Sequence, residues 1–184
     1  MCIQVYLGAD RPLPTIPRPH VTPDTDLVPL KPGTPPIWVQ PLDPALNPEP
    51  GQPHAKHRMG EPVLDVEALV RQHLNQPYLY YLGSFMDCGC GFGYADAPLT
   101  RPEWDDDRVQ DSVMWWEAFR EATHQLAAYL ENVTRDEPVT LLVCWSGEAD
   151  RPPQRRTEVT PDYFRAPEVS LFPTASELIT VVPG

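Results

Sequence analysis

The sequence predicts an α/β or α+β fold, with a single small mixed sheet of about four to six strands covered by two helices. Three observations predict this fold class. The chain has 184 residues, the usual size of one domain. Short apolar runs with a period of two alternate with two longer segments of helical spacing. Fourteen of the 25 prolines lie between residues 11 and 53, so this part cannot be helical. We therefore expect residues 1–184 to form one domain that includes a long extended segment.

The first strand is expected at residues 2–7, CIQVYL. Successive side chains of a strand point to opposite faces of the sheet. Ile3, Val5 and Leu7 therefore share one aliphatic face, and Cys2 begins the other face.

The proline-rich part is expected to span residues 8–60 as a wrapping segment or loop within the domain. A structureless loop of this length is unusual in a compact domain, so we expect at least one short strand inside it. Residues 36–42, PIWVQPL, are the best candidate. Their prolines would interrupt the hydrogen bonds of a central strand, which predicts a position at the edge of the sheet.

Two segments have the spacing of amphipathic helices. The first covers about residues 65–75, with an aspartate at its start and an apolar stripe that includes Val66, Leu69 and Val70. The second covers about residues 105–132 and opens with three aspartates, which cap a helix and suit its positive end. Its apolar face consists of Val109, Val113, Trp116, Thr123, Leu126, Leu130 and Val133.

The remaining apolar runs predict strands. Residues 78–83, YLYYLG, form a buried strand, and residues 138–145, PVTLLVCW, form the most clearly apolar one. One strand each is expected within residues 155–164 and 176–184.

A short pattern, Ala-Asp-Arg-Pro, occurs behind two of the predicted strands. It lies in GADRPLP, residues 8–14, and in GEADRPPQ, residues 147–154. One interpretation is chance in a chain rich in these residue types. The other is that the two strands are parallel neighbours, which would place both loops at the end of the sheet where ligands of open α/β sheets collect.

The net charge limits the partners that we expect, and the apolar runs and the N-terminus indicate the compartment. A net charge of -12 and a pI near 4.7 repel nucleic acid and anionic membrane surfaces, so neither is expected as a partner. No apolar run reaches the roughly 18 residues of a membrane span. The N-terminus lacks the basic segment of a signal peptide. We therefore expect a cytoplasmic protein with reduced cysteines.

The cysteines are the main candidates for function. Cys88 and Cys90 are separated by one glycine within a glycine-rich loop, residues 83–94. With Cys2 and Cys144 they make four thiols, enough for a tetrahedral zinc site or an iron–sulfur cluster. Cys2 and Cys144 lie on predicted strands, opposite to the aliphatic side chains, and adjacent strands would bring the two sulfurs together. The first hypothesis is thus a thiolate site for zinc or another thiophilic metal, built from these cysteines.

Other roles for the same cysteines stay open. Reduced cysteine behaves as a small apolar residue, and Cys144 within an apolar strand suits the core. Cys88 and Cys90 could instead exchange between dithiol and disulfide. Cys2 follows the initiator Met, and its removal would expose a cysteine with an α-amine, the arrangement of N-terminal nucleophile hydrolases. In this one residue the chain resembles the class II glutamine amidotransferases, which begin Met-Cys-Gly, although Ile3 replaces their glycine. The resemblance implies a cysteine-dependent enzyme.

The last hypothesis is a non-catalytic module that binds an unknown protein partner. Trp115 and Trp116 are adjacent, so on a helix they point about 100° apart and cannot both face the core. A partly exposed tryptophan, together with the proline-rich segment, would suit such a surface. His73 and His124 lie on predicted helices, from which either could approach the glycine-rich loop that contains Cys88 and Cys90, which we call the cysteine loop.

Overall fold

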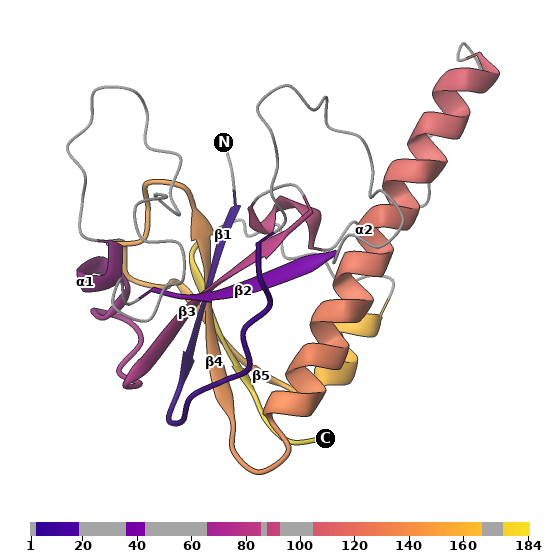
Figure 1. Ribbon diagram of the computed structural model, residues 1–184. Coiled ribbons are helices and arrows are strands. Elements are labelled where there is room, and N and C mark those ends of the chain that lie inside the picture. The colour runs from indigo at the N-terminus through magenta and orange to yellow at the C-terminus, as the bar shows by residue number, and fades with distance from the viewer. Residues whose placement is uncertain (1–2, 19–35, 43–65, 86–87, 93–104, 167–174) are drawn as a thin grey trace.

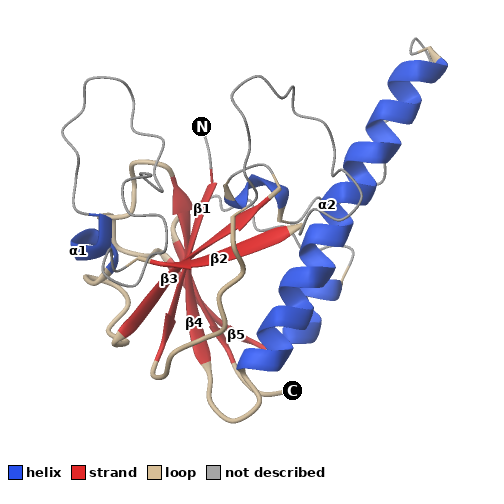
Figure 2. Cartoon of the chain, in the orientation of Figure 1, coloured by secondary structure: helices blue, strands red, loops and turns tan. Residues whose placement is uncertain are grey.

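The computed structural model describes residues 3–18, 36–42, 66–85, 88–92, 105–166 and 175–184, except for the side chain of Asp111. The described elements form one mixed six-stranded sheet with a long helix, α2, along one face (Figure 1). The short helix α1 packs on the other face. Figure 2 shows the same arrangement by secondary structure. The prediction of a mixed sheet covered by two helices is confirmed, and the fold belongs to the α+β class.

The strand order in the sheet is β2-β3-β1-β4-β6-β5. Neighbouring strands are antiparallel, except for β5 and β6, which are parallel. The bounds of the strands are β1 Ile3–Ala9, β2 Ile37–Pro41, β3 Tyr78–Ser84, β4 Val139–Trp145, β5 Arg155–Val159 and β6 Glu177–Val181. Each strand lies where the sequence predicts one.

The central strand β1 supplies side chains to two separate cores. Val5 and Leu7 belong to the larger core, which lies between the sheet and α2 and includes Leu126 and Leu130. Tyr6 points to the opposite face and belongs to the smaller core, together with residues of α1. This confirms the alternation predicted for the strand. We call the two sides of the sheet the α2 face and the α1 face.

Helix α2 (Asp106–Val133) begins as predicted. The carboxylate of Asp105 accepts a hydrogen bond from the backbone N–H of Arg108 at 3.0 Å, which caps the helix. Buried side chains begin only at Ala118, and the N-terminal half of the helix extends past the sheet (Figure 1). Val109 and Val113 are accordingly half-buried. The predicted apolar face is therefore core in the C-terminal half of α2.

Helix α1 (Val66–Val70) is shorter than the predicted helix at residues 65–75. The chain turns after Val70, whose carbonyl accepts hydrogen bonds from the N–H groups of both His73 and Leu74. The turn directs the buried Leu74 into the core of the α1 face. The apolar stripe was thus predicted correctly, but a tight turn completes it. Asp65 lies outside the described residues.

The proline-rich segment, residues 8–60, contains the predicted edge strand. β2 lies at the edge of the sheet and pairs with β3 on one side. On its other side, Ile16 and Val39 exchange two backbone hydrogen bonds of 3.0 and 2.9 Å. The segment therefore pairs with its own strand and covers part of an edge that would otherwise be open to other chains. Residues 19–35 and 43–60 of it lie outside the described residues.

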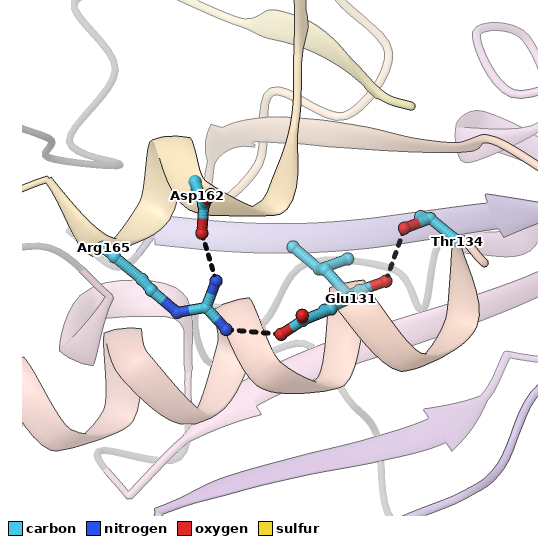
Figure 3. A network of polar contacts seen from close by, with 5 residues as sticks. Glu131, Thr134, Asp162 and Arg165 are labelled. Carbon is cyan, nitrogen blue, oxygen red and sulfur yellow. Dashed lines mark hydrogen bonds and ion pairs between the residues drawn. The ribbon is translucent and has the colours of Figure 1, made fainter. Parts of the chain in front are cut away.

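A short 3₁₀ helix, η2 (Pro161–Arg165), lies against the C-terminal half of α2 through the buried Phe164. At the surface the guanidinium of Arg165 donates to the carboxylates of Asp162 and Glu131, the latter at 2.6 Å (Figure 3). These groups are largely exposed, and exposed ion pairs contribute little to stability. The apolar contact of Phe164 is therefore what holds η2 on α2.

Candidate functional site

The cysteine loop forms a compact turn against the start of β1. Its centre is the 3₁₀ helix η1 (Gly89–Gly91), which follows β3. The backbone N–H of Ile3 donates to Sγ of Cys90 at 3.1 Å. A Cβ atom at position 89 would lie 2.7 Å from Val5 Cγ2, so only glycine lets the loop approach β1 this closely. The loop thus packs on the α2 face of the sheet.

The two sulfurs of the loop both accept backbone hydrogen bonds. Cys88 is buried, and its Sγ accepts from the N–H of Cys90 at 3.4 Å. Cys90 is half-buried and accepts from Ile3. N–H donors aimed at sulfur favour negative charge on it, and such bonds surround the cysteine ligands of metal centres. Both residues carry thiols and not a disulfide.

Ser84 holds the loop in this conformation. Its hydroxyl donates to the carbonyl of Cys88 at 2.7 Å and accepts from the N–H of Gly91 at 3.1 Å. Its backbone N–H donates to the same carbonyl at 2.8 Å, and the residue is fully buried. Sequence reasoning missed Ser84. The one signal for it was a small polar residue that directly follows the predicted apolar strand, at the start of the glycine-rich loop.

Cys144 does not join the loop. β4 is adjacent to β1, as the cysteine hypothesis required, and Cys144 pairs with Gln4. Its side chain belongs to the core of the α1 face, however, whereas the loop packs on the α2 face. Burial, and to a lesser degree the carboxylates of Glu148 and Asp150, together raise the pKa of the Cys144 thiol to about 12. A thiol that keeps its proton is a poor ligand and nucleophile.

We therefore expect Cys144 to be unreactive in the native protein. Iodoacetamide at pH 8 should leave Cys144 unmodified until the chain is unfolded, as peptide mass spectrometry can measure. The raised pKa means that the folded state holds the thiol proton more tightly than the unfolded state. This contribution to stability is complete below pH 9 and is lost as the pH rises from about 9 towards about 12. In urea unfolding, C144A should weaken this pH dependence. Native alkylation as fast as that of the unfolded chain would contradict the assignment.

The position of Cys2 lies outside the described residues. Its peptide bond, however, links it to the nitrogen of Ile3, the atom that donates to Cys90. Within the described part of the chain, no group of three or more histidine, cysteine or acidic side chains is arranged to hold a metal ion. The described residues thus provide one pair of neighbouring thiols, Cys88 and Cys90.

The repeated Asp-Arg pattern does not form one site. β1 and β4 are antiparallel neighbours, so the loops that follow them lie at opposite ends of the sheet. The interpretation that they are parallel neighbours is therefore wrong. It could not be tested from the sequence, because the local sequence of a strand carries no information on its direction in the sheet.

His73 also lies away from the cysteine loop, in the turn after α1. His124 is exposed on α2.

Trp115 and Trp116 are both half-buried. Trp115 packs against Phe85 and Phe119, with ring centroids 6.0 and 6.1 Å apart. Arg120 lies 4.7 Å above the ring of Trp116. Most of their surface is therefore engaged within the chain. Among the described residues, the large apolar side chain that is clearly exposed is Met114, at 39%.

Comparisons with protein-family models, with curated proteins and with solved structures found no match. Among the described helices, α2 included, none has both the length and the apolar composition that crossing a membrane requires. A fold alone does not define a function, so the chemistry of particular side chains must carry any proposal.

Proposed function

We propose that the protein binds a thiophilic metal ion, with zinc as the first candidate, through the thiolates of Cys88 and Cys90 and a third from Cys2. The hydrogen bond from the N–H of Ile3 to Sγ of Cys90 carries this proposal. It holds the first residue of β1 against the cysteine loop, and Cys2 is bonded directly to that residue. Cys144 is left out of the ligand set because it lies within β4, with its side chain in the core of the opposite face. Cys2 precedes the first residue of β1, so the alternation of that strand does not fix the direction of its side chain.

The chemistry of the loop supports a metal thiolate. Zinc–sulfur bonds are about 2.3 Å long, so ligands must come from a backbone that can fold closely around the ion. In the turn of η1 a single glycine separates the two cysteines, and each sulfur accepts a hydrogen bond from a backbone N–H. Three thiolates would leave a fourth position for water or another ligand, as in zinc sites that are not closed.

Such an ion would join the start of β1 to the loop after β3. Binding to the folded state alone stabilises a protein in proportion to the logarithm of metal concentration over Kd. The site would therefore have a structural or sensory role, in which metal availability sets how firmly the N-terminal strand is held.

The test is the metal content of protein purified without chelator. We expect about one zinc per chain by elemental analysis. C88S and C90S should each abolish stoichiometric binding, and C2S should weaken the affinity at least about tenfold, because a ligand is lost. C144S is the matched control and should retain full metal. Titration with Co²⁺ reports thiolate ligation independently through its charge-transfer absorption.

Two results would reject the proposal. One is a wild-type protein that binds neither zinc nor Co²⁺ while the thiols of the loop titrate freely. The other is a C144S variant that loses as much metal as C90S, since this would show that metal content follows fold stability and not ligation.

A further inference from the structure

We propose that the edge strand β5 pairs with β5 of a second copy of this chain, which makes a symmetric dimer whose sheet continues across both chains. Within the described residues, β5 pairs with β6 alone and ends the sheet. The opposite edge differs, because the chain's own Ile16 pairs with β2 there. An edge strand presents N–H and C=O groups that another strand can use. The proposal concerns the β5 edge and does not depend on the metal site.

The hydrogen bonds to β6 define which backbone groups of β5 point outward. The carbonyl of Val159 accepts a hydrogen bond from the N–H of Val182, directly after β6. Backbone groups of alternate residues in a strand point to the same side, and the register of β5 on β6 is unbroken, so those of Thr157 also point to β6. The N–H and C=O groups of Arg156 and Glu158 therefore point away from β6. Both residues are exposed, which leaves this side of β5 accessible.

A twofold axis at Thr157 places unlike charges opposite one another. In an antiparallel pair centred on this residue, Arg156 of each copy lies opposite Glu158 of the other copy. These two pairs are the hydrogen-bonded ones, because the backbone groups of both residues point outward. Directly opposite residues have Cβ atoms about 4.5–5.5 Å apart, and opposite charges at such positions stabilise the pairing. The β5 edge is therefore complementary to itself.

The same two charges disfavour the neighbouring registers. A shift of the axis to Arg156 places the two arginines opposite each other, and a shift to Glu158 does the same with the two glutamates. Like charges directly opposite destabilise a sheet. An axis between two residues would place outward backbone groups opposite inward ones, so no hydrogen bonds would form. Charged side chains usually prevent pairing at an edge, and in β5 they prevent the shifted pairings and favour the one centred on Thr157.

The test is analytical ultracentrifugation of the full chain at about 5 to 500 µM in about 0.15 M salt, which screens the repulsion between chains of net charge -12. We expect a monomer–dimer equilibrium with a Kd in the micromolar range, since a single strand pair is a small interface. R156E and E158R should each raise Kd at least about tenfold, because each creates two pairs of like charges. The double variant R156E/E158R restores opposite charges and should recover the wild-type Kd.

Three further measurements locate the contact between the chains. R108E is the matched control, because it makes the same charge change at an exposed position on α2, and it should keep the wild-type Kd. EDTA should leave Kd unchanged, which separates this dimer from one held by metal at the cysteine loop. Hydrogen exchange of the amides of Arg156 and Glu158 should slow as the wild-type concentration rises, because these N–H groups become bonded.

Three outcomes would overturn the proposal. The first is a monomer over the whole concentration range. The second is a dimer whose Kd is unchanged in R156E and E158R, since the chains would then associate elsewhere. The third is a double variant that dimerises as weakly as the single variants, which would reject the register centred on Thr157. Zinc content enters none of these outcomes, so this proposal and the metal proposal can fail independently.

Discussion

Replacing Gly83 by alanine is expected to destabilise the protein more than other single-methyl changes in the sheet. A Cβ atom at position 83 would lie 2.0 Å from Cε2 and 2.2 Å from Cζ2 of the Trp38 ring. These distances are far below van der Waals contact, so either the ring or the strand must move. Forced overpacking of a core costs about 1–3 kcal/mol and occasionally more. We expect a loss near or above 3 kcal/mol, a large part of the 5–15 kcal/mol by which domains are stable.

The Trp38 ring has little freedom to move away. It is 1% exposed and stacks on Tyr81, with ring centroids 5.0 Å apart. Its Nε1 donates to the carbonyl of Ser84 at 3.1 Å. A shift of the ring would break this buried hydrogen bond and open a void in the core of the α1 face. The contact between β2 and β3 therefore requires glycine at position 83.

Urea unfolding of G83A beside two variants tests this explanation. G147A is the control, because Gly147 has a φ of 84° with open space around it, so alanine there strains the backbone without a clash. G147A should lose about 1 kcal/mol. G83A should cost less stability in a W38L background than in the wild-type background, because the clashing ring is gone. Wild-type stability of G83A, or an equal loss from G83A in both backgrounds, would contradict the steric account.

Most elements of the fold could be predicted from local sequence, because the spacing of apolar residues and the positions of prolines specify each element separately. The alternation of Ile3, Val5 and Leu7 gives β1 its period of two, and the prolines around β2 exclude a central position. Strand direction was not predictable in this way. The antiparallel pairing of β1 with β4 joins residues about 140 apart, and only the packing of the whole chain decides it. The same holds for the turn that shortens α1.

The candidate sites were predictable to a lesser degree. The loop could be predicted from the sequence because Cys88 and Cys90 are close together in it. The face of the sheet on which the loop packs could not be predicted. Sequence reasoning placed Cys144 near the loop because both β1 and β4 carry cysteines opposite to their aliphatic side chains. That argument requires the loop to pack on the α1 face, to which Cys144 points. The loop packs on the α2 face instead, where Gly89 lies against Val5. A pocket lined by His73, Gln76, Thr140, Arg156 and Thr180 among others combines residues from the segment after α1 and from β4, β5 and β6, which no sequence motif connects.

Replacing Ser84 by alanine is expected to loosen the cysteine loop. The substitution removes the hydroxyl that donates to the Cys88 carbonyl, and it leaves the N–H of Gly91 without its acceptor. An unsatisfied buried donor costs about 1–3 kcal/mol, so we expect a loss of about 2 kcal/mol in stability. The backbone N–H of Ser84 still donates to the Cys88 carbonyl at 2.8 Å, so the turn should persist in a more mobile form.

Measurement of alkylation separates a local effect on the loop from a general loss of stability. In S84A, Cys88 should be modified by iodoacetamide several-fold faster than in the wild type, because its burial depends on the closed turn. T134A is the matched control. The Thr134 hydroxyl is buried and donates to the carbonyl of Leu130 at 2.8 Å, at the C-terminal end of α2 (Figure 3). T134A should lower stability by a similar amount and leave the Cys88 rate nearly unchanged. Equal rates for Cys88 in S84A and T134A would show that Ser84 stabilises the fold as a whole and does not position the thiols.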